Sequence, residues 1–211
     1  MFNSIQRWSS LAALGLALLA AGCSKQPTRV TPAAIDAAAA GKAAIAAYDK
    51  NGDGVISGNE LDKCPALKSA LKFYDHDGDG KVTAEAITAR IQKWQASKQA
   101  LVSVTLAIEL DGQKLEGANV TLDPEPFLGP NLSPATGVTD GQGMADPRVE
   151  QTTLRGVSPG LYKLRISKKV DGRETIPARY NTETELGLEA APGGFSFMKP
   201  REIKLSSKSG K

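Results

Sequence analysis

The chain has 211 residues, with 26 basic and 23 acidic side chains and a formal net charge of +3 at neutral pH. An excess this small gives no support for a nucleic-acid partner, and we expect none. Histidine occurs once, as His76, and it lies within the acidic segment at residues 75–86, so no Ser–His or Cys–His nucleophile is expected. Because the sequence also lacks a Gly-rich phosphate loop and a Cys/His cluster, we expect that the protein is not an enzyme.

Residues 1–22 are typical of a signal peptide. Arg7 precedes an apolar run over residues 11–20, which is too short to span a bilayer as a mature helix. The run leads through small residues to Cys23, and in this it resembles a bacterial lipoprotein signal. The resemblance implies that Cys23 is acylated and anchors the protein to a membrane. Ordinary cleavage after an A-x-A-like site is the alternative.

Residues 23–31 would then form a tether between the lipid and the folded chain. In the lipoprotein resemblance, Ser24 favours the outer membrane or the periplasmic face of the cell envelope. Cys64 is the only other cysteine, so no internal disulfide is expected beside an acylated Cys23. We expect Cys64 to act as a small buried apolar residue.

Residues 49–60 place oxygen-bearing side chains at the spacing of a calcium loop. Side-chain oxygens stand at loop positions one, three, five and twelve, and Gly54 stands at position six, where the chain turns sharply. Calcium prefers roughly six to eight oxygen ligands, and few other tasks need this many at this spacing. The predicted ligands are Asp49, Asn51, Asp53, Val55 through its carbonyl, Ser57 directly or through water, and Glu60. The alternative is an acidic, Gly-rich surface turn.

Residues 75–86 repeat the pattern with one defect. The predicted ligands are Asp75, Asp77, Asp79, Lys81 through its carbonyl, and Thr83. Position twelve is Ala86 in place of the expected bidentate glutamate, and Glu85 stands one residue early. Three alternatives follow: Glu85 reaches the ion through local distortion, water completes the shell, or the loop is only a structural partner.

Both loops resemble the EF-hand superfamily, which implies a helix–loop–helix pair over residues 32–100 with Ca²⁺ as its ion. Helix-end patterns agree with this. Thr31 and Pro32 predict the start of the first helix, and Pro65 predicts the start of another. Ser57 and Glu60 form a capping box, and Thr83 is expected to cap a last helix that runs to about residue 100.

From residue 101 the pattern changes to the alternation of half-buried strands. Turn residues recur, for example at Asp111–Gly112 and Asp171–Gly172, and residues 195–197 are expected to form one of the last strands. Short strands at this spacing predict an antiparallel β-sandwich of about seven strands over residues 101–206, followed by a tail at 207–211. The fold class expected is therefore α+β, with two domains.

Motifs in this half resemble carboxypeptidase-regulatory-like, transthyretin-like domains. They are G-A-x-V at residues 117–120, T-D-x-x-G at 139–143 and P-G-x-Y at 159–162. The segment I-P-x-x-Y at 176–180 is similar to one in short lipoproteins of planctomycete-type bacteria. The resemblance implies a binding module for an unknown protein or polysaccharide partner.

Two functions remain open. In the first, calcium is mainly structural and rigidifies a helical pair that presents the β-sandwich module. In the second, the pair is a sensor or adaptor whose helices open with calcium and expose an apolar surface to a protein partner. The short link between the two loops and the scarcity of methionine favour the first function.

Overall fold

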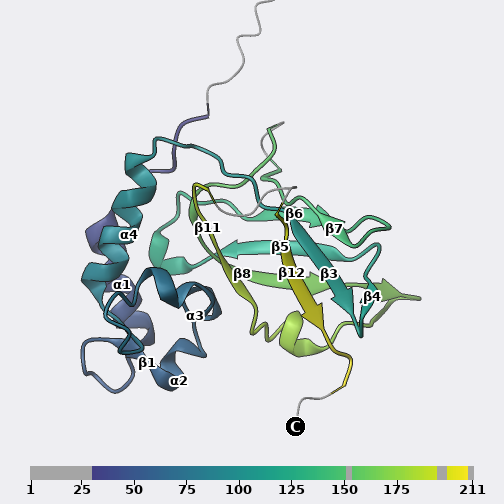
Figure 1. Cartoon of the computed structure of the whole chain (residues 1–211), viewed down its shortest axis with the longest axis horizontal. Coiled ribbons are helices and arrows are strands. Elements are labelled where there is room, and N and C mark those ends of the chain that lie inside the picture. Colours follow the sequence, from purple (N-terminus) through teal and green to yellow (C-terminus); the bar gives the residue numbers. More distant parts are fainter. Residues whose placement is uncertain (1–29, 151–153, 194–198, 209–211) are drawn as a thin grey trace, which may run out of the picture.

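A computed structural model describes residues 30–150, 154–193 and 199–208. The predicted signal peptide, Cys23 and the strand over residues 195–197 lie outside the described residues. A helical part comes first and a strand-rich part follows (Figure 1), so the predicted order of an α+β chain is confirmed. Among the described residues, no helix combines the length and apolarity needed to cross a bilayer.

The helical part is built around two long helices packed against each other. Its helices are α1 (Ala37–Tyr48), α2 (Gly58–Leu61), α3 (Pro65–Ala70), the 3₁₀ helix η1 (Leu71–Phe73) and α4 (Ala84–Ala96). A Cβ added at Gly41 of α1 would lie 2.4 Å from the carbonyl oxygen of Ala84, so the two backbones touch there. Ile87, Ile91 and Trp94 form the buried stripe of α4.

Two helix starts follow the sequence prediction, and two other helix ends differ from it. Pro65 opens α3, and the Thr83 hydroxyl caps α4 by accepting the N–H of Ala86 at 3.1 Å. The predicted start at Pro32 is wrong, because Asp36 caps α1 by accepting the N–H of Ala39 at 3.0 Å. The last helix ends at Ala96 because Lys98, with φ of 55°, leaves the helical conformation.

Within its described residues, the strand-rich part has two four-stranded sheets and a short hairpin. One sheet has the order β11–β8–β5–β6, and the other has the order β12–β3–β4 with β7 paired to β3. The strands are β3 (Leu106–Leu110), β4 (Gln113–Lys114), β5 (Asn119–Pro124), β6 (Ala135–Val138), β7 (Met144–Ala145), β8 (Gly160–Ser167), β11 (Gly187–Ala190) and β12 (Arg201–Leu205), and the hairpin is β9 (Lys169–Val170) with β10 (Arg173–Glu174). Two 3₁₀ helices, η2 (Pro126–Leu128) and η3 (Ala178–Tyr180), lie in the connections.

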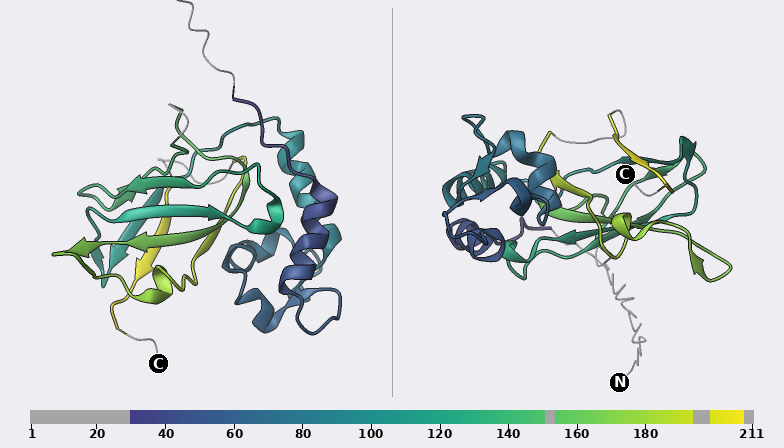
Figure 2. Two further views of the ribbon diagram at one scale, coloured as in Figure 1. Left: turned by 180° about the vertical axis from the view of Figure 1, so that it is seen from behind. Right: turned by 90° about the horizontal axis from the view of Figure 1, so that it is seen from below.

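The sheets lie one over the other (Figures 1 and 2), and their facing side chains form the core. The expectation of purely antiparallel pairing is wrong at one edge, since β12 runs parallel to β3 with Ile203 opposite Ile108. A strand that returns by a long connection, and not through a hairpin, can pair in parallel. Asp111 and Gly112 form the predicted tight turn, both with positive φ.

The helical part packs on the sheet edge at β11, where strand alternation fails. All four residues of β11 are buried, because α3 covers the face that would otherwise meet solvent. Gly187 permits this contact, since a Cβ there would lie 2.3 Å from the backbone nitrogen of Ala66. One continuous hydrophobic cluster therefore runs through the helices and both sheets.

Glu189 of β11 forms the main polar joint between the two parts. Its side chain is 5% exposed and accepts hydrogen bonds from Arg90 Nε and Nη2, each at 2.7 Å. Tyr74 and Trp94 also donate to it, each at 3.1 Å. The carboxylate thus binds donors from α4 and from the residue that follows η1.

Glu125, between β5 and η2, forms a second joint at the end of α1. The Tyr48 hydroxyl donates to Oε2 at 2.7 Å, and Lys163 Nζ lies 3.9 Å from the same oxygen. The side chain is fully buried, and Oε1 accepts no hydrogen bond from the described residues. Burial raises the pKa of Glu125, although the Tyr48 hydroxyl and the Lys163 ammonium oppose the shift.

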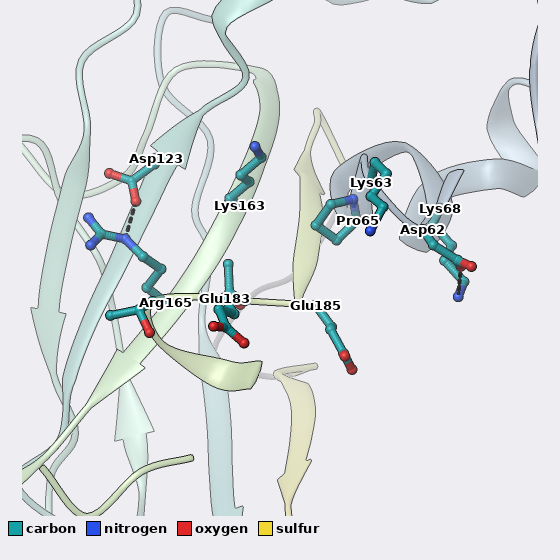
Figure 3. A pocket seen from close by; sticks show the side chains of 11 residues that line it. Asp62, Lys63, Pro65, Lys68, Asp123, Lys163, Arg165, Glu183 and Glu185 are labelled. Atoms are coloured by element: carbon teal, nitrogen blue, oxygen red, sulfur yellow. Dashed lines mark hydrogen bonds and ion pairs between the residues drawn. The ribbon is translucent and has the colours of Figure 1, made fainter. Parts of the chain in front are cut away.

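A polar cavity of about 770 Å³ lies between the two parts (Figure 3). Arg165 bonds Asp123 on the sheet side, and Lys68 pairs with Asp62 on the helical side. The other charged residues of the lining are two lysines, Lys63 and Lys163, and two glutamates, Glu183 and Glu185. Neither sign of charge therefore dominates the cavity.

The contact at Gly187 gives a stability prediction. Gly187→Ala should lower the free energy of unfolding by about 1–3 kcal/mol, because its methyl group would overlap the backbone of α3. Urea unfolding measures the change. Gly141→Ala is the matched control, since its Cβ would meet only Glu116 at 3.8 Å. Equal losses in the two variants would contradict the close packing of α3 on β11.

The buried Glu125 predicts a specific pH dependence of stability. Between the ordinary value of 4.5 and the raised folded pKa, the folded state holds a proton that the unfolded state releases. Stability therefore falls as pH rises through that window, and Glu125→Gln should remove this component. Urea unfolding from acidic to neutral pH should show Glu125→Gln gaining on the wild type as pH rises. Glu202→Gln, at an exposed position of β12, should follow the wild type at every pH.

Candidate metal centre

Two loops lie side by side at one end of the helical part. Loop one (49–60) connects α1 to α2, and loop two (75–86) connects η1 to α4. Their short strands β1 (Ile56–Ser57) and β2 (Lys81–Val82) pair antiparallel, with Ile56 opposite Val82. Both of these apolar side chains are fully buried. The pairing fixes the position of each loop relative to the other.

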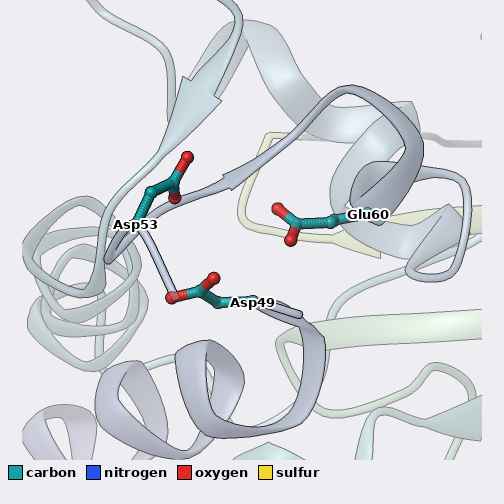
Figure 4. Close-up of side chains that lie close together, drawn as sticks. All are labelled: Asp49, Asp53 and Glu60. Carbon is teal, nitrogen blue, oxygen red and sulfur yellow. The ribbon is translucent and has the colours of Figure 1, made fainter. Parts of the chain in front are cut away.

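Loop one gathers three carboxylates around one point (Figure 4). Side-chain oxygens of Asp49, Asp53 and Glu60 lie within 4.8 Å of one another. Asn51 joins this cluster, since its amide donates to Asp53 at 3.0 Å. Three acidic groups this close repel one another in the absence of a cation, so the cluster favours a bound positive ion.

Backbone N–H groups hold the carboxylate at position one in place. Asp49 accepts from Gly52 at 2.7 Å and from Gly54 at 2.9 Å. Gly54 has φ of 87°, a conformation that glycine adopts without steric cost. The side chain is therefore oriented by the loop itself.

Glu60 serves the loop and the following helix together. One oxygen accepts the N–H of Ser57 at 3.1 Å, as the predicted capping box requires. The other accepts the N–H of Lys50 at 2.7 Å, which ties the last loop residue to the start of the loop. The N–H of Val55 donates to Asp53 at 3.1 Å. All six predicted residues of loop one thus take part in hydrogen bonds within the loop.

Loop two has the same geometry at its first positions. Asp75 accepts from Gly78 at 2.7 Å and from Gly80 at 2.9 Å, as Asp49 does at the matching positions. Side-chain oxygens of Asp75, Asp77 and Asp79 lie within 4.8 Å of one another. Desolvation raises the pKa of Asp75, but the N–H groups of Gly80, Gly78 and Asp79 together bring it below its ordinary value. The carboxylate is thus held in its charged form.

The end of loop two differs from the end of loop one in the residue at position twelve and in its charged neighbours. Ala86 lines an open cavity beside Asp77 and Asp79, where loop one has Glu60. Glu85 is exposed and lies outside the carboxylate cluster, so the structure does not bring it to the ion position. Lys81 Nζ lies 3.6 Å from Asp79 and competes with a bound cation for that carboxylate. Thr83 is engaged as the cap of α4.

The residues that precede each loop fix it to the sheets, and sequence analysis did not find these contacts. Tyr48 stands directly before Asp49 and bonds Glu125, and Tyr74 stands directly before Asp75 and bonds Glu189. The partners are 77 and 115 residues apart in the chain, so no local pattern reveals them. Both loops are thus attached to the strand-rich part through the residue that directly precedes each of them.

Comparison with protein families agrees with this geometry. The EF hand family model matches residues 42–65 and 67–85. The first match contains all of loop one, and the second covers loop two as far as Glu85. A comparison with curated proteins finds no match. Residues 42–85 therefore form an EF-hand module, the class of helix–loop–helix unit that binds calcium.

Proposed function

We propose that this protein binds Ca²⁺ through loop one, with Asp49, Asn51, Asp53, Ser57 and Glu60 as side-chain ligands and Val55 as a carbonyl ligand. The observation that carries the proposal is the convergence of the Asp49, Asp53 and Glu60 oxygens within 4.8 Å in an EF-hand loop. Oxygen ligands in a flexible loop suit this hard cation. No catalytic role is proposed for the described residues.

Loop two is a weaker calcium site in this proposal. It supplies Asp75, Asp77 and Asp79 with the carbonyl of Lys81 and the hydroxyl of Thr83, but it has no carboxylate at position twelve. Each loop supplies three carboxylates, but loop two lacks the bidentate glutamate at position twelve, and the smaller number of ligand oxygens lowers its affinity. Water would complete the coordination shell at Ala86, where the cavity is open.

The proposed role of calcium is structural. A sensor must open its helices and expose an apolar groove. Here α3 lies against β11 through Gly187, and both Tyr48 and Tyr74 are bonded to buried carboxylates of the strand-rich part. Opening would break these contacts, so they favour a calcium-rigidified unit over the alternative of a calcium-dependent adaptor.

In the cell, we propose a lipoprotein held at the outer membrane or periplasmic face of the envelope through Cys23. The strand-rich part would act as a transthyretin-like module that faces a protein or polysaccharide partner. The motifs around residues 117–120, 139–143 and 159–162 support this proposal. Metabolic labelling with a fatty-acid analogue tests the anchor, and loss of the label in Cys23→Ala is the expected result.

Calorimetric titration of the full-length protein with calcium tests the main site. Glu60→Gln should weaken the tightest binding at least about tenfold, because it removes a charged ligand that also ties the loop together. The control is Glu85→Gln, at an exposed residue outside both carboxylate clusters, which should bind as the wild type does. Unchanged binding in Glu60→Gln would contradict the assignment. A calcium-induced rise in binding of an apolar dye would favour the sensor alternative.

The defect in loop two should be repairable. Ala86→Glu places a carboxylate at position twelve and should raise the calcium affinity of this loop at least about tenfold. Ala86→Gln is the control, because it has similar size and capping ability but no charge. The titration should show a second tight site only in Ala86→Glu. If both variants bind as the wild type does, the missing carboxylate is not what weakens loop two.

A further inference from the structure

A second cavity, distinct from the calcium loops, is lined mainly by positive charge. It has a volume of about 540 Å³ and lies where η1, α4 and β12 meet. Its basic lining residues are Lys72, Arg90, Lys199 and Arg201. Glu189 is the only acidic side chain among the described residues that line it. Four basic residues against one acidic residue leave three positive charges.

Glu189 cannot neutralise the rest of this cavity. Both of its oxygens are engaged by Arg90, and Tyr74 and Trp94 donate to the same carboxylate. Its negative charge is therefore paired with Arg90, in the contact between the helical and strand-rich parts. A concave surface with one sign of charge concentrates the field and attracts ions of the opposite sign.

Phe73 positions two of the cations at the rim. Its side chain is 40% exposed, and Lys72 Nζ lies 4.9 Å from the ring centroid. Arg90 Cζ lies 4.5 Å from the same centroid. Attraction between a cation and an aromatic face holds the charged groups beside the cavity and leaves an apolar wall next to them.

Arg201 adds a partly desolvated guanidinium to the lining of the cavity. It lies on β12, on the same side of the strand as the buried Ile203, and burial lowers its pKa. A guanidinium in such surroundings interacts more strongly with an anion than one in bulk water. Its planar group also fits the paired oxygens of carboxylate, sulfate or phosphate.

We propose that this cavity binds an oxyanion, free in solution or carried on an acidic polysaccharide. Lys72 and Lys199 supply the attraction, Arg201 adds its positive charge to the lining, and Arg90 is held by Glu189 and shapes the wall. This site gives the strand-rich part a binding chemistry that the calcium proposal does not provide. It also stands apart from that proposal, since none of its lining residues is a predicted calcium ligand.

The test compares two charge reversals, one at Lys199, two residues before β12 begins, and one at Lys204 within β12. Lys199→Glu changes the cavity, whereas Lys204→Glu makes the same change on the other side of β12, where the side chain is 72% exposed and pairs with Glu202. The full-length protein at saturating calcium is titrated with inorganic sulfate, dextran sulfate and neutral dextran at low ionic strength. Lys199→Glu should weaken sulfate or dextran sulfate binding about tenfold, and Lys204→Glu should leave it unchanged.

A second variant of the cavity lining checks that any loss of binding in Lys199→Glu does not come from misfolding of that one variant. Lys72→Glu, at an exposed position on η1, should weaken binding to a similar degree. If free sulfate and dextran sulfate compete with similar affinity per group, the ligand is a free ion. Much tighter binding of the polymer indicates an oxyanion on a chain. Equal weakening by Lys199→Glu and Lys204→Glu, binding of neutral dextran as tight as dextran sulfate, or no binding of either anionic probe would overturn the proposal.

Discussion

The arrangement of this molecule depends on one buried carboxylate, that of Glu189. It stands on β11 and accepts hydrogen bonds from Tyr74, Arg90 and Trp94, all of them in the helical part. Removing Arg90 while the helices still cover Glu189 would leave a buried charge without its partner, which costs about 3–5 kcal/mol. The same contact fixes Arg90 and the residue before loop two. It therefore positions Arg90 in the lining of the cavity formed with Lys72, Lys199 and Arg201, and it also positions the start of loop two.

The joint at Glu125 has a different energy balance. Tyr48 donates to one oxygen, while the other accepts no hydrogen bond from the described residues. A buried polar group that is only half satisfied destabilises its surroundings. The nearby apolar contacts offset this, among them the edge-to-face packing of Tyr48 on Phe127 with a centroid distance of 6.2 Å. This joint is therefore held mainly by packing, whereas that at Glu189 is held by charge-assisted hydrogen bonds.

Local sequence rules predicted the parts of the molecule that local forces decide. The gathering of the loop-one carboxylates, the cap at Thr83 and the turn at Asp111 each depend on a few neighbouring residues, and the structure shows all three. The start of α1 was misplaced because Thr31, followed by Pro32, and Asp36 both fit the pattern of a helix start, and the structure uses Asp36. Capping rules work where one candidate is present and fail where two compete.

Contacts between distant segments were beyond those rules. Alternation predicts one buried face per strand, yet every residue of β11 is buried because α3 covers its second face. The parallel pairing of β12 with β3 also depends on where a long connection returns. The residues next to Glu189 in the sequence form no motif that would predict its burial. Its partners lie 95 to 115 residues away in the chain, so its role becomes visible only in the folded molecule.

These long-range contacts determine what calcium can do. A ligand that binds only the folded state stabilises it by about 2.7 kcal/mol when its concentration is a hundred times the dissociation constant. In an isolated helical pair, that free energy would act on the pair alone. Here Tyr48 and Tyr74, which directly precede the two loops, are each bonded to a buried carboxylate of the strand-rich part, within one continuous hydrophobic cluster. Calcium bound at loop one would therefore stabilise the strand-rich part as well as the helices, and the same connection opposes the opening movement that a sensor needs.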